Sequence, residues 1–123
     1  MPTIAFLANL STAEHKRRWD LLNQHASDGV NVIVADPKSS PGELIEALKD
    51  ADAAVPWLAS IPLDVAEHLP KLKLVQLLTA GYDSVDVIGL SKLGIKVANN
   101  GGSNAISVSE HTISLMLSVY RRM

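Results

Sequence analysis

Short runs of apolar residues, rich in valine, isoleucine and leucine, alternate along the chain with segments of mixed polarity. A short apolar run bounded by polar residues or glycine is typical of a strand that is buried on both faces of its sheet. The intervening segments carry their apolar residues at the spacing of a helix. The pattern predicts strands at 3–8, 30–35, 53–57, 72–78 and 95–99.

The segments between these strands carry helix signals. The capping-box spacing, in which serine or threonine is followed three residues later by glutamate, occurs at 11–14 (STAE) and 40–43 (SPGE). A brief helix is predicted from Pro62 to Leu69. A further helix is predicted within 84–94, with Gly94 in the left-handed position that ends it. The last helix is predicted to begin at Ala105.

Strand and helix alternate, which predicts a parallel sheet with helices on both faces. Five strands in a chain of this length indicate an α/β fold: a flavodoxin-like, doubly wound parallel five-stranded sheet, followed by a C-terminal helix. Ligands of such sheets bind beyond the carboxyl ends of the strands. Candidate chemistry is therefore expected at Asn9, Asp36, Trp57, 79–81 and 99–104.

The last predicted helix is apolar on more than one side, with apolar residues at 106, 108, 113, 115, 116, 117, 119 and 120. A helix that is apolar on several sides is buried on several sides, and one small sheet covers only one of them. We therefore expect this helix to pack against another domain or against a second copy of the chain.

The amino-acid composition excludes several classes of function. The chain has 123 residues, enough for one buried core, and a net charge of -2 that gives no electrostatic case for nucleic acid or an anionic membrane. It contains no cysteine, which excludes disulfides and thiolate chemistry and fits a cytoplasmic location. We expect no signal peptide, no transmembrane segment and no metal site.

The stretch 99–112 (NNGGSNAISVSEHT) invites two other interpretations. A dinucleotide-binding loop needs G-x-G-x-x-G after a first strand, but no G-x-G occurs in the chain, and the P-loop lysine is also missing. Residues 101–105 are nearly the G-x-S-x-G of a hydrolase nucleophile elbow, yet only the adjacent Glu110 and His111 follow as acid and histidine. A phosphoacceptor receiver domain would need acids where Asn9 and Trp57 stand.

Two stretches resemble one family strongly: 79–86 (TAGYDSVD) and 103–111 (SNAISVSEH). They look like the D-isomer-specific 2-hydroxyacid dehydrogenases, which include phosphoglycerate, glyoxylate/hydroxypyruvate and formate dehydrogenases. The second stretch is most similar to the formate dehydrogenase branch, although Asn99 stands where that branch tends to carry an acid.

The resemblance implies an oxidoreductase that transfers hydride between nicotinamide and a 2-keto or 2-hydroxy acid. In the family a flavodoxin-like substrate domain is interrupted by a Rossmann domain. Residues 1–103 would be the substrate-binding domain, and 104–123 a hinge or interface helix crossing to the Rossmann domain. The family's catalytic arginine, glutamate and histidine and its G-x-G-x-x-G lie later than this chain extends. We therefore expect no catalytic residue here, an inactive isolated chain, and NAD or NADP only in the complete enzyme.

The same resemblance implies substrate-binding residues. Backbone groups of Gly81 and Tyr82 would hold the substrate carboxylate, and the side-chain amide of Asn104 would face them across the cleft. Pro56 and Trp57, with Leu58, would form a wall beside the substrate. Tyr82 and Ala105 would border the cofactor.

Plainer roles stay open for these residues. The turn at Gly81 can be an ordinary strand-to-helix connection in which Asp83 or Ser84 caps the helix. Asn104 can be a helix N-cap, and Trp57 can be a packed core residue. The whole chain can also be a stand-alone, non-catalytic binding or regulatory module. We expect a homodimer through 104–123 where the Rossmann domain is absent. The residues leave open the oligomeric state of the complete protein, which acid it uses and which nicotinamide cofactor.

Overall fold

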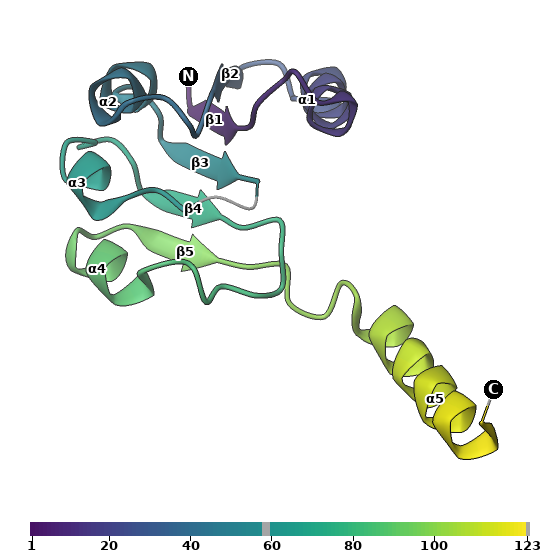
Figure 1. Cartoon of the computed structure of the whole chain (residues 1–123). Helices are drawn as coiled ribbons and strands as arrows, with labels where there is room; N and C mark the ends of the chain where they lie inside the picture. Colours follow the sequence, from purple (N-terminus) through teal and green to yellow (C-terminus); the bar gives the residue numbers. More distant parts are fainter. Residues whose placement is uncertain (58–59, 123) are drawn as a thin grey trace.

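Five parallel strands form one sheet in the order β2-β1-β3-β4-β5, as the computed structural model shows (Figure 1). The structure describes residues 1–57 and 60–122, so Leu58 of the predicted wall lies outside the described residues. The strand order is that of a flavodoxin-like sheet, which confirms the predicted fold class. The strands are β1 (Thr3–Leu7), β2 (Asn31–Ala35), β3 (Ala53–Pro56), β4 (Leu74–Gln76) and β5 (Lys96–Ala98).

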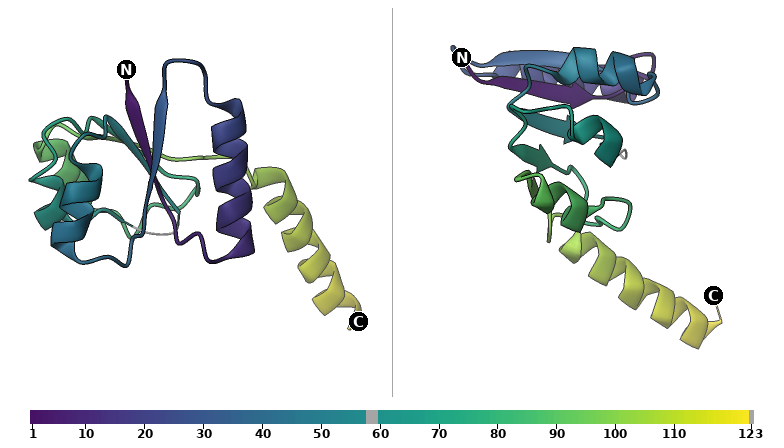
Figure 2. Two further views of the ribbon diagram at one scale, coloured as in Figure 1. Left: turned by 90° about the horizontal axis from the view of Figure 1, so that it is seen from above. Right: turned by 90° about the vertical axis from the view of Figure 1, so that its left-hand side faces the viewer.

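The helices divide between the two faces of the sheet. Helices α2, α3 and α4 stand in a row along one face, and α1 lies on the other (Figures 1 and 2). This arrangement follows from the right-handed crossovers that parallel strands require. The helices are α1 (Ala13–His25), α2 (Pro41–Leu48), α3 (Leu63–Ala66), α4 (Val87–Lys92) and α5 (Ala105–Arg121).

The core lies between the sheet and the row of helices. Alternate residues of each strand point to this side, because side chains alternate along a strand. Small residues on β1 and β3 let the helices approach the sheet closely, and leucine and valine fill the space between them. The core includes Ala5, Leu7, Leu44, Leu48, Ala54, Val65, Val75, Leu77 and Leu90.

The two predicted capping boxes behave differently. The carboxylate of Glu43 accepts hydrogen bonds from the hydroxyl (2.7 Å) and the backbone N–H (2.8 Å) of Ser40, and these two bonds lower the pKa of Glu43. At the first helix the capping box is absent, because Asn9 accepts the hydrogen bond from Ser11 that the box would give to Glu14. The Ser11 N–H donates to Asn9 Oδ1, and Thr12, not Ser11, is the N-cap.

The start of α4 corrects another expectation. Asp86 is its N-cap, and the carboxylate accepts from the backbone N–H of Gly89 at 2.8 Å. Asp83 and Ser84 therefore do not cap this helix. Its end matches the sequence pattern, since Gly94 has φ +78° directly after the last turn.

Helix α5 leaves the sheet and projects away from it (Figures 1 and 2). None of its residues is buried, and Leu115, Met116, Val119 and Tyr120 are all more than half exposed. The helix therefore does not pack into the core of its own sheet. In the part of the chain that the structure describes, no helix combines the length and apolarity needed to cross a membrane.

Candidate substrate-binding site

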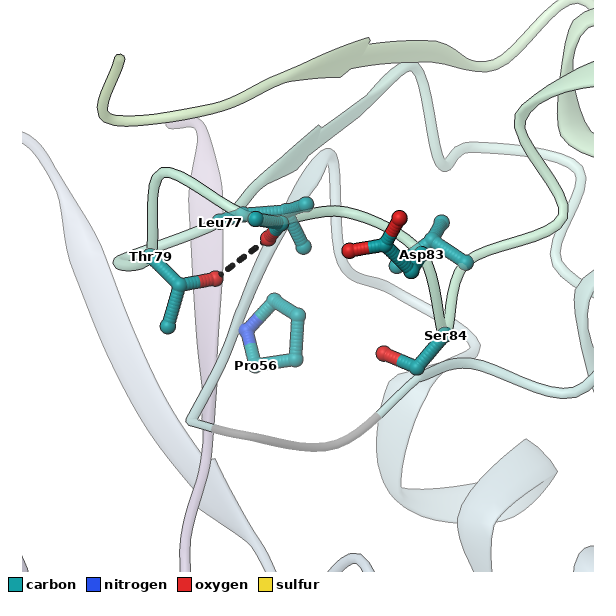
Figure 3. A pocket seen from close by; sticks show the side chains of 7 residues that line it. Pro56, Leu77, Thr79, Asp83 and Ser84 are labelled. Carbon is teal, nitrogen blue, oxygen red and sulfur yellow. Dashed lines mark hydrogen bonds between the residues drawn. The ribbon is translucent and has the colours of Figure 1, made fainter. Parts of the chain in front are cut away.

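A hollow of about 330 Å³ opens where β3 and β4 end (Figure 3). Pro56 forms one side of it, and the segment that follows β4 curves around the other side. Its position beyond the carboxyl ends of parallel strands is where a doubly wound sheet binds ligands. The lining residues are Pro56, Leu77, Thr79, Gly81, Asp83, Ser84 and Val85.

The segment 79–82, which we call the β4 loop, has all four of its carbonyl groups hydrogen-bonded. The Thr79 carbonyl accepts from the Asn100 N–H at 3.0 Å, and the Tyr82 carbonyl accepts from the Val85 N–H at 3.0 Å. Two side chains supply the other donors: Asn99 Nδ2 donates to the Ala80 carbonyl at 2.7 Å, and Thr79 Oγ1 donates to the Gly81 carbonyl at 2.8 Å.

The N–H groups of the same segment, in contrast to its carbonyls, make no hydrogen bonds within the described residues. Among residues 1–57 and 60–122, no carbonyl or side chain accepts a hydrogen bond from the N–H groups of residues 80–84. A backbone whose carbonyls are occupied and whose N–H groups are open presents partial positive charge to a ligand. The β4 loop is therefore suited to bind an anion through its backbone.

Two side chains add chemistry to the hollow. Asp83 contributes a carboxylate and Ser84 a hydroxyl, and Figure 3 shows both on the side opposite Pro56. The Asp83 carboxylate would repel an anion, but the residue is exposed, and water screens its charge.

Gly81 has room for a side chain as far as the fold is concerned. A Cβ atom there would have Asp83 Oδ2 as its nearest neighbour at 3.5 Å, an ordinary contact distance. Packing therefore does not require glycine here, whereas a ligand that approaches the backbone does.

The predicted site residues are only partly brought together. Pro56 and Gly81 line the hollow. Tyr82 is 56% exposed and lines a neighbouring hollow, together with Val87, Val97 and Asn99. Their proposed roles in substrate and cofactor binding stay predictions.

Trp57 points to the other face of the sheet, toward α1. The guanidinium of Arg18 lies 3.9 Å from the centre of its ring, and the His15 ring meets it edge-on at 5.9 Å. Cation–π contacts of this kind hold an aromatic ring in place. Trp57 does not line the hollow, so its role as a substrate-side wall stays a prediction.

Asn104 and Ala105 stand at the start of α5, and both are exposed. Asn104 occupies the N-cap position, but its side chain makes no capping hydrogen bond. The amide is thus not used by the helix. Neither residue lines the hollow, and their contacts with substrate and cofactor stay predictions.

The family model for the catalytic domain of D-isomer specific 2-hydroxyacid dehydrogenases matches residues 5–121. The chain belongs to this family. The match runs from within β1 to the end of α5, and it includes both stretches on which the resemblance rests.

Individual members agree with the match. A glyoxylate reductase of Thermococcus litoralis is 33% identical over 90 residues, which are 72% of this chain and 27% of the relative. A D-3-phosphoglycerate dehydrogenase of Methanocaldococcus jannaschii is 38% identical over 82 residues, 66% of this chain and 16% of the relative. The crystal structure of NAD-dependent formate dehydrogenase from Staphylococcus aureus, in complex with NAD, has a TM-score of 0.72 at 26% identity.

The chain is short beside these relatives. The alignment with the Staphylococcus aureus dehydrogenase covers 96% of this chain but 38% of the dehydrogenase chain. The sequence of this chain contains no G-x-G-x-x-G, the motif that binds a dinucleotide between a strand and a helix of a Rossmann domain. Within the described residues, no group of three or more histidine, aspartate or glutamate side chains is placed to hold a metal ion.

The sequence did not predict the roles of two side chains in the site. Thr79 and Asn99 lie in the segments 79–81 and 99–104, where candidate chemistry is expected, but the pattern does not show that they donate the hydrogen bonds to the Gly81 and Ala80 carbonyls. The available signal was the position of both residues directly after a strand, at the edge where ligands bind.

Proposed function

We propose that residues 1–103 are the substrate-binding part of a D-2-hydroxyacid dehydrogenase and that the β4 loop holds the carboxylate of a 2-keto or 2-hydroxy acid. The observation that carries this proposal is the polarity of the loop, with four carbonyls occupied and the N–H groups of 80–84 open within the described chain. Family membership supplies the class of ligand.

The chemical task of this part is to hold the substrate still. Hydride transfer is supplied by a bound nicotinamide cofactor, and it requires the keto carbon to stay in one orientation. Two N–H donors on adjacent residues, Gly81 and Tyr82, can grip a carboxylate and fix the direction of the carbonyl beside it. Pro56 closes the opposite side of the hollow. In this proposal NAD or NADP is bound by a separate Rossmann domain.

We also propose that α5 is an interface helix through which two copies associate. Its exposed apolar residues would otherwise remain in contact with water, and patches of that kind mark interfaces. Gly102, with φ +83°, lies in the connection that directs the helix away from the sheet. A helix on such a connection can pack on a second copy or be exchanged with it.

Titration with glyoxylate tests the binding proposal. Followed by ¹H–¹⁵N NMR on this chain, the amide signals of Gly81 and Tyr82 should move and saturate. Gly81→Ala should weaken binding by more than about tenfold, because its methyl group obstructs a hydrogen bond to a charged ligand. The fold should be kept, given the 3.5 Å clearance to Asp83 Oδ2.

Gly42→Ala is the matched control. Gly42 lies in α2, away from the hollow, and a Cβ atom there meets nothing within 4 Å. It should leave glyoxylate binding unchanged. Shifts that spread evenly over the chain, or equal affinity in Gly81→Ala and wild type, would remove the β4 loop as the binding site.

A further inference from the structure

The two side chains that hold carbonyls of the β4 loop each act on one peptide plane. We propose that Asn99 and Thr79 are positioning residues that fix the directions of the N–H groups of Gly81 and Tyr82, of which Gly81 lines the hollow. The inference rests on the proposed function only for the identity of the ligand. The orientation of the two N–H groups is a property of the free protein.

The geometry of the peptide bond links each side chain to one donor. In a trans peptide the carbonyl of one residue and the N–H of the next lie in one plane and point in opposite directions. No cis peptide bond occurs in the described chain. Because Asn99 Nδ2 holds the Ala80 carbonyl at 2.7 Å, it fixes the direction of the Gly81 N–H.

Thr79 acts on the next peptide plane in the same way. Its Oγ1 holds the Gly81 carbonyl at 2.8 Å and thereby fixes the direction of the Tyr82 N–H. Figure 3 shows this bond running along the edge of the hollow. The two adjacent donors proposed for the carboxylate are thus set by two different side chains, one from the end of β5 and one from the loop itself.

A purely structural role fits these bonds less well. The ends of β4 and β5 are already joined by backbone bonds, from the Leu77 N–H to the Ala98 carbonyl at 2.7 Å and from the Asn100 N–H to the Thr79 carbonyl at 3.0 Å. Both side-chain bonds are exposed to solvent, where a hydrogen bond adds little net stability. Their specific effect is on the orientation of the peptide planes.

Residual dipolar couplings of backbone N–H groups measure this orientation directly. In the free protein, Asn99→Ala should change the coupling of Gly81 most, and Thr79→Val should change that of Tyr82 most. Thr79→Ser keeps the hydroxyl and should retain the wild-type couplings. Asn100→Ala is the matched control, because the bond from Asn100 to the loop comes from its backbone N–H.

The same samples are then titrated with glyoxylate. Each of Asn99→Ala and Thr79→Val should weaken binding by roughly three- to tenfold, the effect of losing one neutral hydrogen bond. Wild-type couplings in both variants would overturn the proposal, as would altered couplings with unchanged affinity. Altered couplings in a protein whose wild-type form binds no glyoxylate would uphold the positioning role and reject the proposed ligand.

Discussion

Leu90→Ala should lower the free energy of unfolding by about 2–5 kcal/mol, the usual cost of emptying a fully buried leucine site. Leu90 is 0% exposed and belongs to the core between α4 and the sheet. The sheet cannot collapse onto the gap, because α4 is held at one end by Asp86 and at the other by the turn into β5. The whole free energy of unfolding of a domain of this size is only about 5–15 kcal/mol.

Urea denaturation followed by circular dichroism measures this change. Leu93→Ala is the control, because Leu93 follows the same helix but is 41% exposed. It should cost well under half as much as Leu90→Ala. Equal losses in the two variants would show that α4 is not packed on the sheet as described.

Leu115→Glu combined with Met116→Lys should abolish self-association of the chain. Both side chains are more than half exposed and lie together with Val119 and Tyr120 on α5. Burying each in an interface contributes about 1.5–3 kcal/mol, so replacing both with charges should weaken a dimer by more than about a hundredfold. The double change leaves the net charge as it was.

Light scattering at micromolar concentration distinguishes the outcomes. Wild type should have the mass of a dimer and the double variant that of a monomer. Ser107→Glu combined with Ser114→Lys is the matched control, since it adds the same charges seven residues apart on the polar side of the helix. A wild-type chain that is already monomeric and stays soluble would defeat the interface.

The sheet could be predicted from the sequence because its signal is physical and local. A parallel strand is buried on both faces, so runs such as 30–35 and 72–78 stand out from their surroundings. The Ser40 capping box was predictable for the same reason, since all its partners lie within four residues. The start of α1 was not, because Asn9, which lies outside the capping pattern, accepts a hydrogen bond from the Ser11 N–H that the pattern pairs with Glu14.

The candidate site was predictable only as a location. Gly81 follows a strand end, where ligands of parallel sheets bind, and Pro56 lies at the end of the neighbouring strand. The roles of Thr79 and Asn99 depend on contacts between β4 and β5 that spacing does not encode, since Asn99 reaches a carbonyl nineteen residues earlier. Likewise, nothing in the sequence places Arg18 over the ring of Trp57.

A crystal structure of the chain with oxamate, an anion shaped like a 2-keto acid, would show directly whether the β4 loop holds the carboxylate. We expect its carboxylate to lie in the hollow beside Pro56, with oxygens about 2.7–3.2 Å from the backbone nitrogens of Gly81 and Tyr82. Oxamate bound instead beside the arginines of α1, with the N–H groups of the β4 loop facing water, would contradict it.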